Sequence, residues 1–438
     1  SGGEGEATFR VFTHYGRTDD LENNPESGQK ECRYFDNEHR AAAEYQKIYN
    51  QKTSPSKGYK EISLASVSIG STKARGTSAG EVDAKTLEIA AEAQREKEKK
   101  AKKKPKGPPP LNLHPDVKDV VTYLYEEATH ALTNTVQAKI TANGIETPLG
   151  ILTIGQIEKG EALLVDIAEV FGKKRLAKAK KADQLADLTG EFYSAIPHRV
   201  GRTRADVLKS VIDSAEAITA KQETLQLMRD MLSVNGEEGS VLYDAEVDQQ
   251  YRSLGCELRA IEPKDKEFKK IAKHVLDSQV KIKSMKVKRI WGVKRPEEHE
   301  RYDGRVGNEQ LLFHGSRASN WVGILSRGIL MPKLVAQMGV RRTDAGWLGH
   351  GIYFGDAACT SAFYAAPGKR RTQFLAVARV ALGKSAKYKK ITWGLTGPPD
   401  GHDSCHGVRG KGSEFADDEF VVYDPARQKL EYLVEFTH

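Results

Sequence analysis

The sequence is short of cysteine and has no long apolar run. No stretch of about 18 consecutive apolar residues, the length that crosses a membrane, occurs in its 438 residues. The four cysteines are far apart and form no C-x-x-C pair, which argues against a disulfide framework and against a zinc finger. No internal repeat is present. We therefore expect a soluble, intracellular protein with reduced thiols and no membrane partner.

The composition is otherwise that of a globular protein with a small basic excess. Hydrophobic residues make up 39% and charged residues 29%, and 68 Lys and Arg against 60 Asp and Glu give a net charge of +8. Most of this excess lies between Arg95 and Lys106, directly before the proline run 108–110. A charge run beside a proline run is typical of a solvated linker. A nuclear address or a nucleic-acid-binding arm remains an alternative.

Patterning divides the chain into three folded regions and this linker. Alternating apolar runs with one helical stretch predict a small α+β domain, helical periodicity predicts an all-α bundle, and short runs between glycine-rich turns predict a β-rich mixed α+β domain. The fold class is therefore multidomain α+β. The predicted boundaries are 7–83 for the first domain, 84–112 for the basic, proline-rich linker, 113–235 for the helical domain and 240–438 for the last domain.

Periodicity also predicts individual elements. A helix in the first domain follows Asn37, with Ala41, Tyr45 and Tyr49 at a spacing of four, between strands at 8–12 and 61–64. The helical domain should pause at Pro197, because residues before proline leave the helical region. Its predicted helices rest on Ile157, Leu164, Ile167, Ala168 and Phe171, on Leu185, Leu188 and Phe192, and on Leu208, Val211, Ala215 and Ile218. Strands are predicted at 311–313, 373–382, 419–423 and 430–436.

Three segments of the last domain stand out. They are L-F-H-G-S-R at 312–317, G-H-G-I-Y-F-G-D at 349–356 and D-E-F-V-V-Y-D at 418–424. Each alone has an ordinary structural explanation, such as a strand-capping His314 or an edge-strand carboxylate at Glu419. The glycines do not form a dinucleotide fingerprint, since they lead into an apolar run rather than into a helix.

Together, the three segments resemble the ADP-ribosyltransferase domain of the poly(ADP-ribose) polymerase family, whose signature is a histidine, a tyrosine and a glutamate in this order. The resemblance extends toward the amino terminus. The run F-Y-S-A-I-P-H at 192–198 is similar to the family's helical regulatory domain. Y-G-R at 15–17, with a helix ending near Lys52, is similar to a WGR domain in which tyrosine replaces tryptophan. The arrangement resembles the DNA-dependent members of the family.

This resemblance implies an activity and roles for single residues. The substrate would be NAD, cleaved at its nicotinamide–ribose bond, with ADP-ribose transferred to the protein itself, to other proteins or to an existing ADP-ribose. Tyrosine rings suit a flat nicotinamide, and a carboxylate suits the positive charge that develops on ribose. The implied catalytic residues are His314, Tyr353 and Glu419, and the implied NAD contacts are His314, Gly315, Ser316, Tyr353, Ser361 and Tyr364.

No metal is expected, because nicotinamide is already a good leaving group from a cationic ring. His402, Cys405 and His406 are zinc-compatible but lack a fourth ligand. Two positions depart from the family pattern, Leu330 and Phe363, so the affinity for NAD should differ. Arg341 and Arg342 either contact the pyrophosphate or belong to a solvated loop.

The resemblance further implies control by DNA. The helical domain would cover the NAD site until a DNA end or nick docks on the first domain. The implied DNA contacts are Tyr15, Arg17 and Lys52, although basic and aromatic residues of this kind also occur on ordinary surfaces. The implied regulatory residues are Glu223 and Asp230, which would face the catalytic domain.

Three functions remain open at this point. They are a DNA-break-activated polymer-forming enzyme of the DNA damage response, a mono-ADP-ribosyltransferase, and an inactive scaffold that binds nucleic-acid ends. We expect a nuclear location if the host is eukaryotic, and cytoplasm or nucleoid if it is bacterial.

Overall fold

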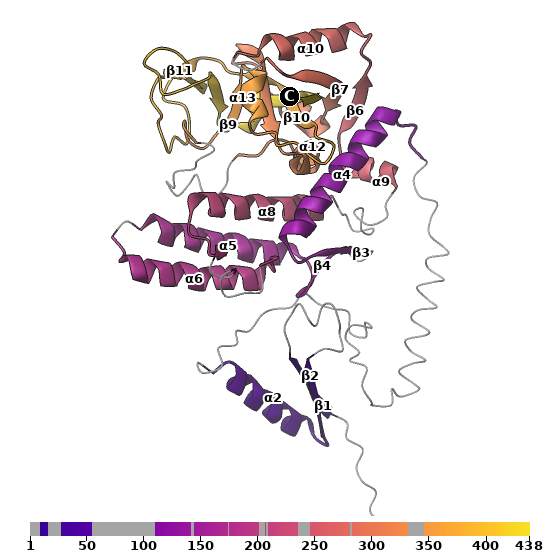
Figure 1. The fold of residues 1–438 in the computed structure, drawn as a ribbon, viewed down its shortest axis with the longest axis vertical. Coiled ribbons are helices and arrows are strands. Elements are labelled where there is room, and N and C mark those ends of the chain that lie inside the picture. Colours follow the sequence, from indigo (N-terminus) through magenta and orange to yellow (C-terminus); the bar gives the residue numbers. More distant parts are fainter. Residues whose placement is uncertain are drawn as a thin grey trace, which may run out of the picture. The chain divides into compact units, whose positions relative to one another are not determined.

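The computed structural model divides the chain into two compact units (Figure 1). One contains Ser1–Pro109 and Glu146–Leu152, and the other contains Pro110–Ile145 and Thr153–His438. None of the helices in the described ranges combines the length and apolar character that a membrane crossing requires. The structure describes residues 9–15, 28–54, 110–141, 144–173, 175–200, 206, 209–234, 246–280, 283–331 and 346–438.

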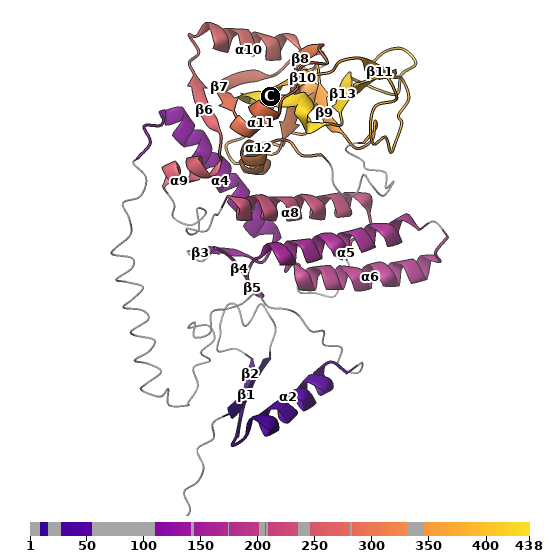
Figure 2. The same cartoon turned by 180° about the vertical axis from the view of Figure 1, so that it is seen from behind.

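The described residues 9–54 of the amino-terminal unit form two paired strands and a helix. Strand β1 (Phe9–Tyr15) pairs antiparallel with β2 (Gln29–Phe35), and helix α2 (Glu38–Lys52) lies along them (Figure 2). The predicted helix start is confirmed, because the Asn37 side chain accepts a hydrogen bond from the His39 amide at 2.7 Å. The predicted apolar face is narrower than the spacing indicated, since of the α2 side chains only Ala41 is buried and Tyr45 is 58% exposed. The predicted strand at 61–64 lies outside the described residues.

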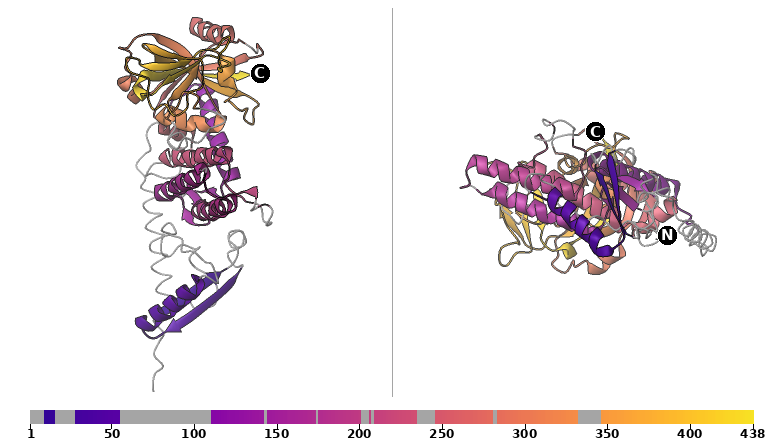
Figure 3. Two further views of the ribbon diagram at one scale, coloured as in Figure 1. Left: turned by 90° about the vertical axis from the view of Figure 1, so that its left-hand side faces the viewer. Right: turned by 90° about the horizontal axis from the view of Figure 1, so that it is seen from below.

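The described residues of the helical region include four long helices. They are α4 (Pro115–Thr135), α5 (Ile154–Gly172), α6 (Lys178–Ala195) and α8 (Ala215–Ser233). Figure 3 shows α5, α6 and α8 stacked side by side. The predicted inward faces are confirmed, with Ile157 and Ile167 of α5 and Phe192 of α6 fully buried. Helix α6 ends at Ala195, directly before the Ile196-Pro197 step, as the proline rule predicts.

Two predictions for this region were wrong. The third helix was expected to include Val211, but α8 begins only at Ala215, because the Ser214 hydroxyl accepts the Ala217 amide at 3.1 Å and caps the helix there. Leu208 lies outside the described residues. Short strands also occur where only helices were predicted, namely β3 (Lys139–Thr141), β4 (Gly144–Thr147) and β5 (Gly150–Ile151).

The carboxy-terminal region is a nine-stranded sheet with helices on both faces. The strand order is β11-β12-β13-β9-β8-β10-β14-β7-β6, and every ladder is antiparallel except β11 with β12. The four predicted strands correspond to β8, β10, β13 and β14. The strands are β6 (Glu257–Ile261), β7 (Lys286–Lys294), β8 (Glu309–Ser316), β9 (Ile352–Gly355), β10 (Gln373–Ala381), β11 (Ser385–Tyr388), β12 (Ser404–Gly407), β13 (Glu419–Val422) and β14 (Gln428–Thr437). The helices are α9 (Val247–Ser253), α10 (Lys266–Asp277), α11 (Pro296–Arg301), α12 (Trp321–Arg327) and α13 (Ala358–Ala362), with 3₁₀ turns at Ala318–Asn320 and Pro425–Arg427.

Strand β10 is buried on both faces, which explains its nearly continuous apolar sequence. Leu375 and Val377 belong to a core with residues of α10 and α13. On the opposite face, the Phe374 ring contacts Trp291 of β7 and Tyr123 of α4, with ring centroids 6.5 and 6.0 Å apart. Helix α4 of the helical region therefore completes the core of the sheet.

Charged groups reinforce this contact. The Asp119 carboxylate on α4 accepts hydrogen bonds from Arg289 of β7 at 2.6 Å and from Arg370, which precedes β10, at 2.6 and 3.0 Å. Arg370 also lies over the Tyr123 ring, 4.2 Å from its centroid. The helical and sheet regions thus pack as one compact unit, while the exact domain boundaries stay a prediction.

Candidate active site

The three segments singled out in the sequence meet where two strands diverge. Strands β8 and β9 form one ladder pair, Phe313 opposite Gly355, within their described lengths. Beyond this pair lies a cavity of about 570 Å³, whose lining includes residues of β8, β9, α13 and the start of β13, with Glu223 of α8 and residues on either side of α12. All the NAD-contact and catalytic residues predicted from the sequence line it, namely His314, Gly315, Ser316, Tyr353, Ser361, Tyr364 and Glu419.

His314 is held by the backbone of the neighbouring strand. Its Nδ1 lies 3.0 Å from the carbonyl oxygen of Tyr353, and because a carbonyl accepts only, Nδ1 carries the proton. Burial lowers the pKa of His314, partly opposed by this bond. The bond is the strand contact that the ordinary structural explanation anticipated. It also fixes the tautomer, so that Nε2 presents a lone pair.

Gly315 and Ser361 are forced together by close packing. A Cβ on Gly315 would lie 1.8 Å from the backbone oxygen of Ser361, so only glycine fits. The Ser361 hydroxyl donates to the Phe313 carbonyl at 3.0 Å, which ties α13 to β8. The Gly315 backbone and the Ser361 hydroxyl therefore form one wall of the cavity.

The tyrosines form two further walls. The Tyr353 hydroxyl donates to the Gly349 carbonyl at 2.7 Å and accepts from the Leu348 amide at 3.0 Å, which fixes the ring by its far end. Tyr364, which follows α13, is 50% exposed, and its neighbour Phe363 is 71% exposed. Both departures from the family pattern, Leu330 and Phe363, also line the cavity. Arg341 and Arg342 lie outside the described residues.

Glu419 is the first residue of β13, an interior strand between β12 and β9. The explanation of Glu419 as an edge-strand carboxylate is therefore wrong. Burial and, secondarily, the nearby Asp417 carboxylate raise the pKa of Glu419 to about 7. Asp417 was missed from the sequence, although residues two apart in an extended segment lie on one side.

The residue before Glu419 is held by side chains from β12 and from the segment that follows it. Asp418 accepts a hydrogen bond from His406 Nε2 at 2.7 Å and forms an ion pair with Arg409 Nε at 2.9 Å. The Arg409 guanidinium also lies 3.6 Å from Asp356, which directly follows β9. His406 is thus engaged by a carboxylate. Across the part of the chain that the structure describes, no group of three or more His, Cys, Asp or Glu is placed to hold a metal ion.

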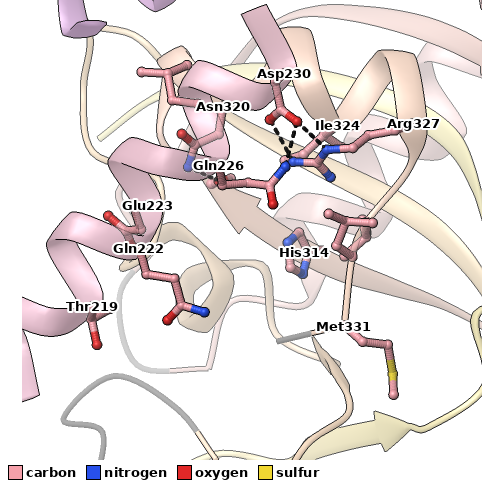
Figure 4. A pocket seen from close by; sticks show the side chains of 14 residues that line it. Thr219, Gln222, Glu223, Gln226, Asp230, His314, Asn320, Ile324, Arg327 and Met331 are labelled. Carbon is pink, nitrogen blue, oxygen red and sulfur yellow. Dashed lines mark hydrogen bonds and ion pairs between the residues drawn. The ribbon is translucent and has the colours of Figure 1, made fainter. Parts of the chain in front are cut away.

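Helix α8 closes one side of the site. A smaller cavity of about 240 Å³ lies between α8 and the segment that contains α12, and His314 and Ser316 line it as well (Figure 4). Asp230 on α8, only 3% exposed, receives two bonds from Arg327 of α12 at 2.6 and 2.8 Å and one from Gln226 at 2.7 Å. The predicted regulatory residues therefore contact the sheet region. Their partners, which the sequence did not reveal, are Arg327 for Asp230 and Arg317 for Glu223, the latter at 3.3 Å.

The predicted DNA-contact residues lie in the other unit. Tyr15 ends β1 and Lys52 ends α2, and the Lys52 ammonium lies over the Tyr15 ring, 4.4 Å from its centroid. The structure brings these two residues together. Arg17 lies outside the described residues.

Three family models match the chain in order. They are the WGR domain at residues 4–65, the regulatory domain of poly(ADP-ribose) polymerase at 112–251 and the catalytic domain of poly(ADP-ribose) polymerase at 265–414. The regulatory match extends to α9, which packs on α4 through a hydrogen bond of 3.0 Å from Tyr125 to the Gln250 carbonyl.

Individual proteins are similar to this chain over much of its length. Protein mono-ADP-ribosyltransferase PARP4 of Mus musculus is 34% identical over 74% of this chain and 16% of its own length. Poly [ADP-ribose] polymerase 2 of Homo sapiens is 30% identical over 55% of this chain and 40% of its own length. Protein mono-ADP-ribosyltransferase PARP3 of Mus musculus is 24% identical over 74% of this chain and 66% of its own length. The chain thus spans less than half the length of the first two. With its WGR, regulatory and catalytic domains in this order, the chain belongs to the poly(ADP-ribose) polymerase family.

Proposed function

We propose that this protein cleaves NAD between nicotinamide and ribose and transfers ADP-ribose to itself and to other proteins. The observation that carries the proposal is the convergence of His314, Tyr353 and Glu419 on one cavity of about 570 Å³. That volume is within the range of roughly 300–1,000 Å³ typical of small-molecule sites.

Each wall of the cavity suits one part of NAD. His314 Nε2 accepts a hydrogen bond from the adenosine ribose, while the Gly315 backbone and the Ser361 hydroxyl hold the carboxamide. The Tyr353 and Tyr364 rings enclose the nicotinamide, a stacking arrangement that contributes on the order of 1 kcal/mol per pair beyond burial. Ser316 lines the same stretch of β8 as His314.

Bond cleavage places positive charge on the ribose, and the Glu419 carboxylate stabilises this charge while accepting a hydrogen bond from a ribose hydroxyl. Nicotinamide leaves as a neutral molecule, with the electron pair of the broken bond. The same carboxylate polarises the incoming acceptor hydroxyl, which is the step that lengthens a chain of ADP-ribose units. No metal has a part in this scheme.

We further propose that the enzyme forms polymer and is switched on by DNA ends or nicks in the DNA damage response. The WGR match, the Tyr15–Lys52 pair and the α8 contacts at the site support this view. In a eukaryotic host the basic run 95–106 would direct the protein to the nucleus, and in a bacterium the protein would act in the cytoplasm or nucleoid.

A second candidate is a mono-ADP-ribosyltransferase. It is favoured by the names of two relatives, since PARP4 and PARP3 of Mus musculus are both called mono-ADP-ribosyltransferases. The chemistry of the first transfer is the same in both candidates, so the length of the product separates them.

The test is incorporation of labelled NAD by the purified protein, with and without short 5′-phosphorylated DNA duplexes, resolved on a denaturing gel. A DNA-dependent smear that the Glu419→Gln variant lacks is the expected result. A sharp band would select mono-transfer. Absence of label with every DNA would contradict the proposed activity and favour a scaffold that binds nucleic-acid ends.

A further inference from the structure

A separate cavity lies within the helical region. It measures about 390 Å³ and is lined by the end of α4, by Tyr193 of α6, by His198 and Arg199 after α6, and by Lys221 of α8. Of the residues that the structure describes, none lines both this cavity and either the NAD site or the smaller cavity under α8. Its ligand is therefore a separate question from the activity proposed above.

His198 gives this cavity a buried group with unused hydrogen-bonding capacity. The side chain is 6% exposed, and its Nδ1 lies 2.7 Å from the Ile196 carbonyl, to which it donates. Its other nitrogen, Nε2, is buried without a hydrogen-bond partner. Burial, with the charge of Lys221, lowers the pKa of His198 to about 4. At neutral pH Nε2 is therefore an acceptor, and such buried groups normally have a donor opposite them.

The rest of the lining is mainly cationic. Among the described residues, the lining holds three cations, Lys221, Arg199 and Lys209, and one carboxylate, Asp206. The Lys221 ammonium lies over the Tyr193 ring, 5.2 Å from its centroid, and Arg199 Nε donates to the Thr133 carbonyl at 2.6 Å, which anchors the guanidinium beside the cavity. Three positive charges against one negative charge favour an anion here.

The lone pair at His198 Nε2 and the excess of cations together restrict which anion can bind in this cavity. The ligand must carry negative charge and also a hydrogen that it can donate. Hydrogen phosphate carries both, whereas sulfate has no hydrogen at neutral pH.

We propose that this cavity binds a phosphate that bears a hydroxyl hydrogen, which donates to His198 Nε2 while Lys221, Arg199 and Lys209 neutralise the remaining oxygens. The source of this phosphate is the free inorganic ion, because the phosphate of a nucleoside monophosphate has a second pKa of about 6 and carries no hydroxyl hydrogen at neutral pH.

Isothermal titration of the full chain with inorganic phosphate, sulfate and adenosine 5′-monophosphate tests the proposal. Phosphate should bind about tenfold or more tightly than sulfate, which corresponds to one well-placed hydrogen bond. Equal affinities for the two ions would overturn the role of His198. Adenosine 5′-monophosphate, whose phosphate carries no hydroxyl hydrogen at neutral pH, should bind no more tightly than sulfate. Tighter binding of this nucleotide than of phosphate would overturn the role of the hydroxyl hydrogen.

Matched variants separate this cavity from other phosphate sites. Lys221→Gln removes a positive charge from the lining and should weaken phosphate binding about tenfold. Asp206→Asn removes a negative charge and should strengthen phosphate binding. Lys180→Gln, an exposed lysine of α6 outside the cavity, is the control and should change nothing.

His198→Asn tests the acceptor directly. Its amide can still donate to the Ile196 carbonyl, but nothing replaces Nε2, so phosphate should bind no better than sulfate. Thermal unfolding of each variant checks that the protein remains folded. Phosphate affinity that is unchanged in both Lys221→Gln and His198→Asn would overturn the proposal.

Discussion

At the scale of single residues, the raised pKa of Glu419 sets the pH range of the reaction. The carboxylate form is the one that stabilises charge on the ribose, so transferase activity should rise with pH through about 7. Asp417→Asn removes the repulsion that contributes to the raised pKa and should move this rise to lower pH. The measurement is initial rate against pH for both proteins at saturating NAD. If the two pH profiles superimpose, Asp417 does not influence the pKa of Glu419.

The ionised Glu419 carboxylate should also lower the free energy of unfolding. Its pKa in the folded chain, about 7, lies above the unfolded value of about 4.3, so folding becomes less favourable as pH rises between these values. Glu419→Gln should therefore raise the unfolding temperature at pH near 8, by a stabilisation on the order of 1–3 kcal/mol, while nearly abolishing chain elongation. Near pH 4 the two proteins should unfold alike. A variant less stable than the parent at pH 8 would contradict the assignment.

A third prediction follows from the close packing at Gly315. Gly315→Ala places a methyl group 1.8 Å from the Ser361 backbone oxygen, so β8 and α13 must separate. We expect loss of NAD binding and a destabilisation of about 1–3 kcal/mol, the usual cost of overpacking. Isothermal titration with NAD measures the first and thermal unfolding the second. The control is Gly190→Ala on α6, because the added methyl group there meets no atom within 4 Å. Gly307→Ala would not serve as a control, because the φ of +73° at Gly307 strains any residue other than glycine.

At the scale of elements, the Asp230–Arg327 pair links α8 to α12 beside the NAD site. Asp230→Ala leaves Arg327 without this partner, and breaking a buried pair typically costs about 3–5 kcal/mol. Since α8 covers one side of the site, its release should raise activity in the absence of DNA. The measurement is NAD turnover without DNA.

A matched control for this prediction is Glu161→Gln. It breaks another ion pair of α8, between Arg229 and Glu161 at 2.8 Å, which joins α8 to α5 rather than to the sheet region. Activity without DNA should change much less in this variant. Equal basal activity in Asp230→Ala and in the unmodified protein would exclude the proposed restraint.

Motifs and periodicity predicted those elements that bury a regular apolar face or carry a recognisable signature. The α5 and α6 faces and the strands around His314 and Glu419 are of this kind. Contacts between distant segments could not be predicted, because Arg327 is 97 positions from Asp230 and carries no local sign of this partner. The start of α8 was misplaced for a related reason, since the Ser214 cap overrides the apolar spacing before it.

At the scale of the whole molecule, activation by DNA should depend on salt. Phosphate contacts release counterions, so activation should weaken by orders of magnitude between about 50 and 200 mM salt. The DNA-independent activity expected of Asp230→Ala needs no such contacts and should change little. Parallel salt titrations of turnover measure both. Equal sensitivity of the two activities would mean that salt acts on the catalytic unit rather than on DNA binding.

The contact of α4 with β10 also has a consequence for biosynthesis. The Asp119–Arg370 pair joins residues 251 positions apart, and the Tyr123–Phe374 ring contact spans the same length of chain. At a translation rate of roughly 5–20 residues per second, α4 leaves the ribosome about 10 to 50 seconds before the strand that covers it. During this interval its aromatic face is exposed to the cytosol. A nascent chain halted before β10 should therefore be a target for chaperones, and one released after β14 should not.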